Sequence, residues 1–210
     1  MTDALARIST SYDTVAVSYA ERVVDGPDWE LEGFGLVTRM AAGRPVLDAG
    51  CGPGRTTALL AGSAAAGAVG SAPGSAGGSV IGLDLSPGMI GVARRDHPEL
   101  DFRVGSMTAL EFPDEHFGGL VTWWSIIHLP RDVVPQALAE FYRVLAPGGL
   151  LLMGFHVGTE SNHKTSGYGD LPMDIWVHLW LPEQLTELAV AAGFTPYAAE
   201  NPEDRLVFRK

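Results

Sequence analysis

The fold is decided by one stretch, Val46-Leu47-Asp48-Ala49-Gly50-Cys51-Gly52-Pro53-Gly54. Apolar β-forming residues run into an acid, and glycine then occupies every second position, which is typical of a buried strand that ends in a tight loop before a helix. Glycine lets a ligand lie directly on the backbone, and the amides that open the helix favour a negative group. Asp48, at the carboxyl end of the strand, would suit a cationic centre. The stretch therefore predicts a ligand that carries both charges.

The composition is that of a globular protein and limits its partners. The 210 residues are 46% hydrophobic and 19% charged, so they can build the core of a single domain over 1–210. The net charge of −11 disfavours nucleic acid and membranes as partners, because both require a basic face. The single cysteine, together with the lack of a membrane-spanning apolar run or signal peptide, predicts a cytoplasmic location.

Strands and helices are predicted to alternate along the chain. A helical cover is expected over 1–42, in which the polar aromatics Tyr12 and Tyr19 either pack on the core or cover a ligand. The glycine stretch leads into a helix over about 55–61. The Gly/Ala/Ser-rich residues 62–79 are expected to form a flexible surface loop, because they cannot build a core.

The second half of the chain continues the alternation. Strands are expected at 80–84, 102–104, 120–125 and 150–155, and helices after Ser86, over 134–145 and over 182–193. Residues 156–180 are expected to be irregular, and 194–199 and 205–209 to form an antiparallel pair. This order predicts a Rossmann-like α/β fold with a doubly wound, mostly parallel sheet.

A second acid separates two classes of cofactor. Asp84 ends the second strand, where an α/β nucleotide site binds the ribose hydroxyls. A dinucleotide fingerprint would place a third glycine three residues after Gly52, but Arg55 stands there. The pattern is Asp-x-Gly-x-Gly-x-Gly, which lacks a pyrophosphate signature.

With these residues the chain resembles the class I S-adenosylmethionine-dependent methyltransferases, in the branch similar to ubiquinone and menaquinone biosynthesis methyltransferases. The resemblance covers about 12–194 and includes Leu145-Ala146-Pro147-Gly148-Gly149. It implies a seven-stranded sheet with one antiparallel strand near the carboxyl end. It also implies S-adenosyl-L-methionine as cofactor, S-adenosyl-L-homocysteine as product and a small-molecule methyl acceptor.

The resemblance assigns cofactor-binding roles residue by residue. These residues are expected to contact the amino-acid end, the ribose, the adenine or the methionine part of the cofactor, or to cover it. They are Asp48, Gly50, Gly52, Asp84, Leu85, Met89, Ser106, Met107, Trp123 and Tyr19. Three features depart from the family pattern. Ser106 stands where an Asp is frequent, Gly118 stands where Phe-Asp is common, and the 62–79 segment is unusually long.

The catalytic residues are harder to name, because the cofactor supplies the reactivity. His128 is the first candidate base and His156 the second; either could instead be a hydrogen-bonded structural histidine. An acceptor pocket is expected from Trp124, Tyr168, Met173 and Trp176, unless these are ordinary core residues. No metal site is expected, because the histidine spacing does not fit zinc and Cys51 is the only cysteine.

Two other functions remain open. One is a protein that binds S-adenosylmethionine without transferring the methyl group, since fold does not fix function. The other is a nicotinamide-dependent oxidoreductase, which shares the fold class. The acceptor atom (O, N or C) and the oligomeric state are left undecided by the residues.

Overall fold

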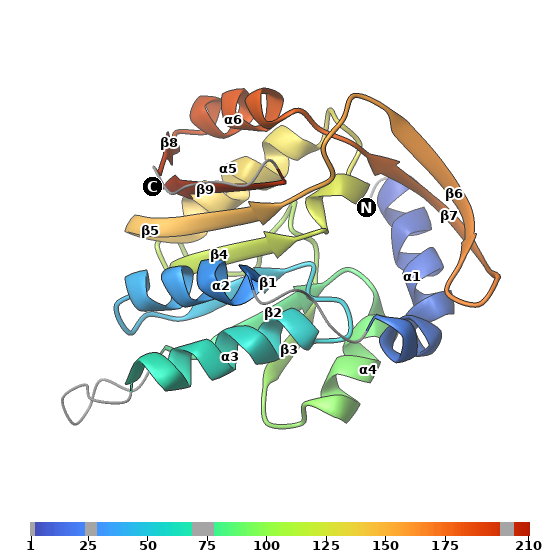
Figure 1. Cartoon of the computed structure of the whole chain (residues 1–210), viewed down its shortest axis with the longest axis horizontal. Coiled ribbons are helices and arrows are strands. Elements are labelled where there is room, and N and C mark those ends of the chain that lie inside the picture. The colour runs from blue at the N-terminus through green and yellow to red at the C-terminus, as the bar shows by residue number, and fades with distance from the viewer. Residues whose placement is uncertain (1–2, 24–28, 69–77, 198–203) are drawn as a thin grey trace.

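A computed structural model describes residues 3–23, 29–68, 78–197 and 204–210. Residues 69–77 of the expected loop lie outside this part. Within it, one sheet has the strand order β3-β2-β1-β4-β5-β9-β8, and a separate hairpin pairs β6 with β7 (Figure 1).

The strands are β1 (Val46–Ala49), β2 (Val80–Asp84), β3 (Asp101–Val104), β4 (Phe117–Trp123), β5 (Leu145–Gly154), β6 (Ser161–Gly167), β7 (Leu171–His178), β8 (Thr195–Pro196) and β9 (Arg205–Arg209). The helices are α1 (Asp3–Arg22), α2 (Trp29–Met40), α3 (Arg55–Ala68), α4 (Pro87–Asp96), the 3₁₀ turn η1 (Ile126–His128), α5 (Val134–Val144) and α6 (Pro182–Ala191).

The pairing of the strands confirms the predicted fold class. Strands β1 to β5 pair in parallel, whereas β9 runs antiparallel to both β5 and β8. Seven strands with one reversed strand near the carboxyl end are what the resemblance implied. None of the described helices has the length and apolar character needed to cross a membrane.

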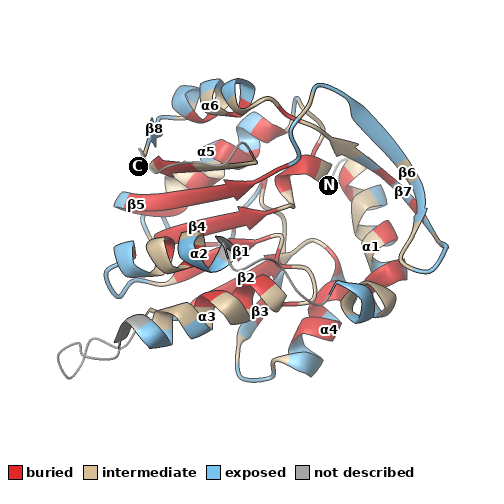
Figure 2. Cartoon of the chain, viewed as in Figure 1, coloured by how far each residue is buried: buried red, intermediate tan, exposed pale blue. Residues whose placement is uncertain are grey.

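Alternate side chains of the buried strands fill two cores, one on each face of the sheet. Leu47 and Leu120 point toward α5 and α6, whereas their neighbours Val46 and Val121 point toward α2 and α3. Figure 2 shows the central strands buried and the outer helix faces exposed. Helices on both faces leave the carboxyl ends of the parallel strands as the place for a ligand.

Gly118 and Gly119 let α2 lie close to β4. A Cβ on Gly118 would lie 2.3 Å from the carbonyl oxygen of Ala41, and one on Gly119 would lie 2.5 Å from Val37. Any larger residue would push α2 off the sheet. The departure from the family pattern at Gly118 is therefore explained by helix packing.

The flexible loop expected over 62–79 does not include residues 62–68. Residues 62–68 continue α3 instead of leaving it at 61. Four of these seven residues are alanine, which has the highest helix propensity, so a segment without core-forming side chains can still extend a helix. The prediction took low hydrophobic content as a sign of a loop and ignored this propensity.

The prediction of an irregular segment over 156–180 is also wrong, because most of this segment forms the β6–β7 hairpin. Leu171, Met173, Ile175 and Val177 alternate with polar or exposed residues, and Met173 and Ile175 are buried. This period of two is the signal of a half-buried strand. The many His and Gly residues around it obscured the pattern.

Of the helical cover expected over 1–42, only α1 lies across the carboxyl ends of the strands. It packs against the hairpin through Val15, Met173 and Ile175, and the backbone N–H of Asp174 donates to Oγ of Ser11 at 2.8 Å. Helix α2 packs on the sheet instead. Figure 1 shows α1 and the β6–β7 hairpin together beyond the tips of β4 and β5. The two form one wall that faces the glycine loop.

Candidate active site

Two adjoining cavities open where β1, β2 and β4 end. The first, of about 120 Å³, lies between α1, the glycine loop, the start of α3 and the end of β4. The second, of about 60 Å³, lies between α1, the end of β2 and the loop that follows β3. Both are lined by Tyr12, Gly50, Asp84, Ser125 and His128, so they are two compartments of one site.

The glycine loop is fixed by the end of β2 and leaves one peptide facing open space. The amides of Gly50 and Cys51 donate to the carbonyl oxygen of Leu83 at 2.7 and 3.0 Å. Gly50 has a φ of +85°, and a Cβ there would lie 2.2 Å from that of Ser125. Gly52 has a φ of +55°, but nothing lies within 4 Å of its Cβ position. A ligand in the first cavity can therefore approach this backbone directly.

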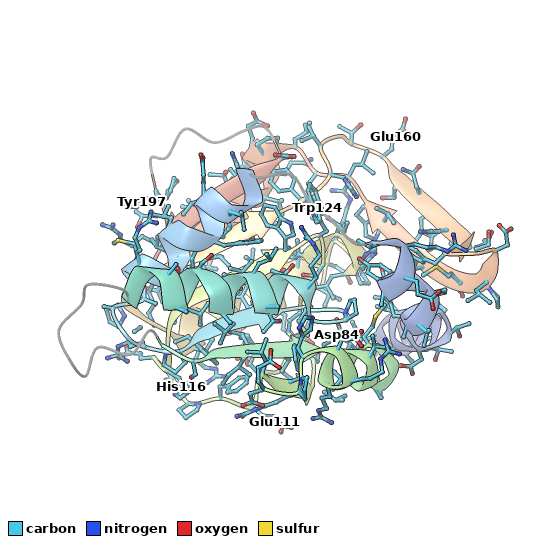
Figure 3. The ribbon with its side chains drawn as sticks, turned by 60° about the horizontal axis from the view of Figure 1, so that its bottom comes forward. Asp84, Glu111, His116, Trp124, Glu160 and Tyr197 are labelled. Atoms are coloured by element: carbon cyan, nitrogen blue, oxygen red, sulfur yellow. The ribbon has the colours of Figure 1, made fainter. Side chains whose placement is uncertain are left out.

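Asp84 is held rigidly at the boundary of the two cavities. Its Oδ2 accepts from the amide of Gly52 at 2.9 Å, and its Oδ1 accepts from the amide of Ser86 at 2.8 Å. Burial raises the pKa of this carboxyl, and the two amide hydrogen bonds lower it in part. Figure 3 shows Asp84 and Trp124 at the carboxyl edge of the sheet, on the side toward α1. A fixed carboxylate in this place can accept hydrogen bonds from hydroxyl groups.

Asp48 lies beneath the loop and lines neither cavity. It is fully buried, and Oδ2 accepts from the hydroxyl of Thr57 at 2.7 Å, while Oδ1 has no protein partner. Burial raises the pKa of Asp48 to about 7, against the lowering effect of the Thr57 hydrogen bond. The contact expected between Asp48 and the ligand therefore stays a prediction, for a carboxyl group that is buried beside both cavities and lines neither.

Tyr12 and His128 form a hydrogen-bonded pair at the junction of the cavities. The phenol oxygen of Tyr12 lies 2.7 Å from Nε2 of His128, and Nδ1 of His128 lies 3.2 Å from the carbonyl oxygen of Trp176. A carbonyl only accepts, so Nδ1 carries the hydrogen and Nε2 accepts from the phenol. Burial lowers the pKa of His128 to about 4, and burial raises the pKa of Tyr12. Both groups are therefore neutral at pH 7.

Trp124 adopts an unusual backbone conformation at the end of β4. Its φ of +53° is in the left-handed region that a bulky residue rarely occupies. The turn places its ring in the lining of the first cavity, and the Oγ of the next residue, Ser125, donates to the carbonyl oxygen of Ala49 at 2.7 Å. His156 stacks on the Trp124 ring at 4.8 Å and lines neither cavity. Its expected role as a second candidate base stays a prediction.

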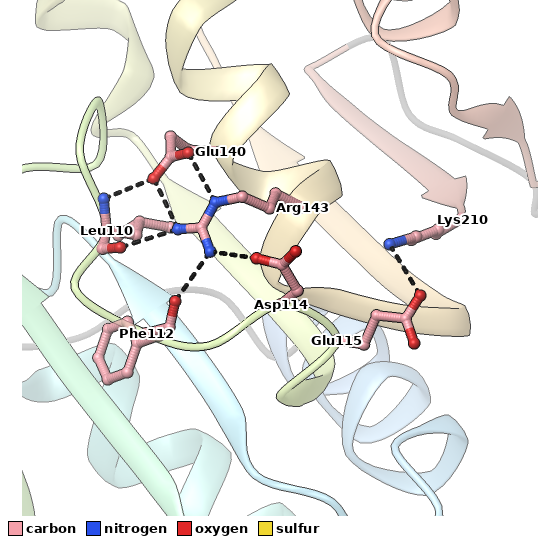
Figure 4. A network of polar contacts seen from close by, with 7 residues as sticks. All are labelled: Leu110, Phe112, Asp114, Glu115, Glu140, Arg143 and Lys210. Carbon is pink, nitrogen blue, oxygen red and sulfur yellow. Dashed lines mark hydrogen bonds and ion pairs between the residues drawn. The ribbon is translucent and has the colours of Figure 1, made fainter.

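The second cavity is lined by Leu85, Ser106 and Met107, and its loop is pinned by α5. Arg143 donates to the carbonyl oxygens of Leu110 and Phe112 at 2.8 and 2.9 Å (Figure 4). It also pairs with Asp114 and with Glu140, whose carboxylate accepts from the amide of Leu110. This network fixes the loop that begins with Ser106 and Met107.

Most of the residues singled out from the sequence meet at this site. The first cavity is lined by Tyr19, Gly50, Gly52, Asp84, Met89, Trp123, Trp124 and His128, and the second by Leu85, Ser106 and Met107. Three expected acceptor-site residues lie elsewhere. Tyr168 and Met173 pack against α1, and the ring of Tyr168 is tilted by 52° to that of Tyr19, with the ring centroids 4.5 Å apart. Trp176 lines a third cavity, behind His128.

Sequence reasoning missed Arg55, Thr56 and Ser125, and did not place Tyr12 among the site residues. Arg55 and Thr56 open α3 and line the first cavity. Their signal was their place at the start of a helix after a glycine loop. Tyr12 lies seven residues before Tyr19, which puts the two on one face of α1. That spacing could have identified Tyr12 as a second residue of the wall.

Comparisons with known proteins agree with this geometry. Residues 46–149 match the family described as a methyltransferase domain. A demethylmenaquinone methyltransferase of Symbiobacterium thermophilum is 33% identical over 148 residues, which are 66% of this chain and 54% of that protein. A probable S-adenosylmethionine-dependent methyltransferase of Mycolicibacterium smegmatis is 34% identical over 154 residues, 73% of this chain and 52% of that protein.

The chain belongs to the class I S-adenosylmethionine-dependent methyltransferases. Its cofactor class is therefore S-adenosylmethionine. The solved structure of a DhpI–SAH complex has the same methyltransferase fold, with a TM-score of 0.70 at 21% identity over 97% of this chain and 94% of that one. The chain spans about half the length of the two curated methyltransferases, so their reactions are not transferred to it by similarity alone.

Proposed function

We propose that this methyltransferase domain transfers a methyl group to a small molecule with an O–H or N–H group, and that Tyr12 and His128 take up the acceptor's proton. The observation that carries the proposal is the 2.7 Å contact between the phenol oxygen of Tyr12 and a neutral His128, at the junction of both cavities. The group methylated is the oxygen or nitrogen itself, or a ring carbon made nucleophilic by loss of that proton.

The residues present fit S-adenosylmethionine. Gly52 offers a peptide with open space above it, and Asp84 offers a carboxylate that faces both cavities. Arg55, at the positive end of α3, suits the carboxylate of the cofactor. The bound cofactor supplies an electrophilic methyl group on sulfur. We assign the methionine part and ribose to the first cavity and the adenine to the second, between Leu85 and Met107.

The proton follows the direction of the hydrogen bonds. Tyr12 donates to Nε2 of His128, so its oxygen can receive the acceptor's proton as its own proton passes to His128. The carbonyl oxygen of Trp176 holds Nδ1–H and thereby the ring orientation. Tyr19 and Trp124 close the first cavity around the reacting groups and exclude water. His156 is not assigned a catalytic role, because it lies behind Trp124.

The first test is calorimetric titration with S-adenosylmethionine, S-adenosylhomocysteine and NAD. We expect binding of the two sulfur compounds and none of NAD. Asp84→Ala should weaken S-adenosylhomocysteine binding by about 1–3 kcal/mol, the range for a lost hydrogen-bond partner that carries charge. Asp101→Asn, which removes an exposed acid of β3, is the matched control.

The second test separates transfer from binding alone. Release of S-adenosylhomocysteine is measured with a panel of small phenols and amines. Product with any acceptor, and its loss in Tyr12→Phe, supports the proposal. Tight cofactor binding without transfer to any acceptor would instead favour a binding protein, and binding of NAD alone would contradict the cofactor assignment.

A further inference from the structure

Trp124 reaches the first cavity from a strained position at the end of β4. Its φ of +53° is one that a bulky residue rarely adopts, and such strain persists only where the surrounding structure enforces it. The preceding residue, Trp123, is 6% exposed and packs against Phe34 with the ring centroids 5.2 Å apart. Trp124 is half-buried and lines the cavity. The strained turn therefore brings the second of two adjacent indole rings out of the core.

Three contacts hold Trp124 in this place. Its amide donates to the carbonyl oxygen of Gly154 at 3.2 Å, and the hydroxyl of Ser125 donates to the carbonyl oxygen of Ala49 at 2.7 Å. The third contact is with His156, which stacks on the indole at 4.8 Å with an angle of 24° between the rings. Since His156 lines neither of the first two cavities, it covers the ring from behind and leaves the opposite face for a ligand.

His156 adds no positive charge behind the ring at neutral pH. Burial lowers the pKa of this histidine, and the nearby Asp204 raises it in part, so the imidazole is largely neutral at pH 7. A neutral partner leaves the negative face of the indole uncompensated. A positive charge on the opposite face of Trp124 would then be attracted by the ring quadrupole.

The first cavity offers few other groups to a cation. Among the described residues that line it, Arg55 and Asp84 are the charged ones. Both oxygens of Asp84 accept from amides, those of Gly52 and Ser86, and the proposed arrangement places the ribose there. The sulfur of S-adenosylmethionine carries a positive charge that S-adenosylhomocysteine lacks. Aromatic faces are what remains for this charge, and indole attracts a cation more strongly than phenol does.

We propose that the open face of Trp124 holds the sulfonium of S-adenosylmethionine by a cation–π contact, and that this contact favours the charged methyl donor over its neutral product. The inference rests on the proposed placement of the methionine part in the first cavity, and it adds a residue that decides which form of the cofactor stays bound. Transfer removes the methyl group and the charge together. The contact is therefore lost after each turnover, which assists replacement of S-adenosylhomocysteine by a new methyl donor.

The test compares the two forms of the cofactor on matched variants. Dissociation constants for S-adenosylmethionine and S-adenosylhomocysteine are measured by calorimetry, without acceptor, for the parent protein, Trp124→Leu and Trp124→Phe. Leucine keeps an apolar side chain for the methyl group but has no ring, and phenylalanine keeps a ring with a weaker attraction. Trp176→Leu is the control, because it makes the same change at a tryptophan that is 44% exposed and lines neither of the first two cavities.

The quantity compared is the Kd of S-adenosylhomocysteine divided by the Kd of S-adenosylmethionine. We expect Trp124→Leu to lower this ratio about tenfold from the value of the parent, mainly through weaker binding of S-adenosylmethionine. Trp124→Phe should lower it less, and Trp176→Leu should leave it unchanged. If Trp124→Leu fails to fold, Trp124→Asn takes its place with the same expected direction, because asparagine tolerates a positive φ.

Two results would overturn the proposal. If Trp124→Leu weakens the binding of both compounds equally, the ratio stays constant and the indole serves packing alone. If Trp176→Leu lowers the ratio as much as Trp124→Leu does, the effect does not come from the first cavity.

Failure of this inference is distinguishable from failure of the proposed function. If the parent protein binds neither compound, the proposed function fails and this inference fails with it. If the parent binds both compounds and the ratio is the same in Trp124→Leu, the proposed function stands and only the role of Trp124 is wrong.

Discussion

Tyr12 donates a hydrogen bond to His128 across 2.7 Å, although the two residues lie 116 positions apart in the chain. Tyr12 belongs to α1, and His128 ends η1, which follows β4. The contact joins the helical wall of the site to the sheet. It also fixes which ring nitrogen of His128 accepts, because the other donates to Trp176. The same hydrogen bond thus joins two walls of the site and sets which nitrogen of His128 carries the hydrogen.

Loss of either partner should reduce turnover more than cofactor binding. Tyr12→Phe keeps the ring but removes the hydroxyl, and His128→Ala removes its acceptor. We expect each to lower kcat about 100-fold, at the lower end of what a positioned acid or base contributes. The double variant should lose little more than either single one, because the two act as a unit. Turnover is compared with Tyr142→Phe, a tyrosine packed on Phe194 away from the site; a normal kcat for Tyr12→Phe would remove the pair from the mechanism.

The pH profile of kcat should show no loss attributable to His128 between about pH 5 and 8. Burial lowers its pKa to about 4, so its neutral, accepting form persists well below the pKa of 6.5 usual for histidine. Activity should fall only as the pH approaches 4 and His128 becomes protonated. The profile is measured for the parent protein and for the residual activity of His128→Ala. A step near pH 6.5 that vanishes in His128→Ala would contradict the lowered pKa.

Asp48→Asn should stabilise the protein at neutral pH. The folded protein binds a proton at Asp48 up to about pH 7, whereas an unfolded Asp loses it near 3.8. The free energy of unfolding therefore falls as the pH rises from about 4 to 7. The variant escapes this loss, so its advantage should grow across that range to at most about 4 kcal/mol, since one pKa unit corresponds to about 1.4 kcal/mol. Urea unfolding at several pH values measures it. A constant difference would mean that Asp48 titrates normally.

Arg143→Met should destabilise the protein and weaken cofactor binding together. The change leaves the carbonyl oxygens of Leu110 and Phe112 without their donor and Glu140 without its cation. We expect a loss of about 1.5–3 kcal/mol in the free energy of unfolding, the range for hydrogen bonds to a charged group. S-adenosylhomocysteine should bind several-fold more weakly, because Ser106 and Met107 begin the loop that Arg143 holds. Arg95→Met, which loses only an exposed pair with its neighbour Asp96, should do neither.

Gly62→Ala should stabilise the protein by about 0.5–1 kcal/mol, the gain from replacing glycine inside a helix. Gly62 lies in α3 and nothing lies within 4 Å of its Cβ position. Gly118→Ala is the contrast, because its Cβ would lie 2.3 Å from the carbonyl oxygen of Ala41 and should destabilise the fold. Thermal unfolding compares the two. If Gly62→Ala gave no gain in stability, residues 62–68 would be in the loop expected from their composition and not in a helix.

The sheet and the meeting of Asp84 with the glycine loop could be predicted because both depend on local patterns. A strand that ends in an acid, followed by glycines or a capped helix, specifies its own geometry within a few residues. The helix expected after Ser86 is α4, and Ser86 caps it by accepting from the amide of Met89 at 3.0 Å. Parallel pairing then brings the ends of β1, β2 and β4 together.

The surroundings of the candidate acceptor residues could not be predicted in the same way, because they depend on contacts between distant segments. Tyr168 and Met173 face α1 rather than a cavity, and only the register of the β6–β7 hairpin decides which side each residue takes. The burial of Asp48 could not be predicted for another reason. The glycine loop folds back onto Leu83, and the sequence does not reveal that Asp48 then lines neither cavity.

The third cavity is lined mainly by α1 and the hairpin, and both lie outside residues 46–149, which match the family. Most of the residues that line the first two cavities lie within the matched part of the chain. A hydrogen bond between Ser11 and Asp174 joins α1 to the hairpin. To transfer acceptor selectivity from one member of the family to another, both segments would therefore have to be exchanged together. Exchange of one segment alone would leave a wall with mismatched halves.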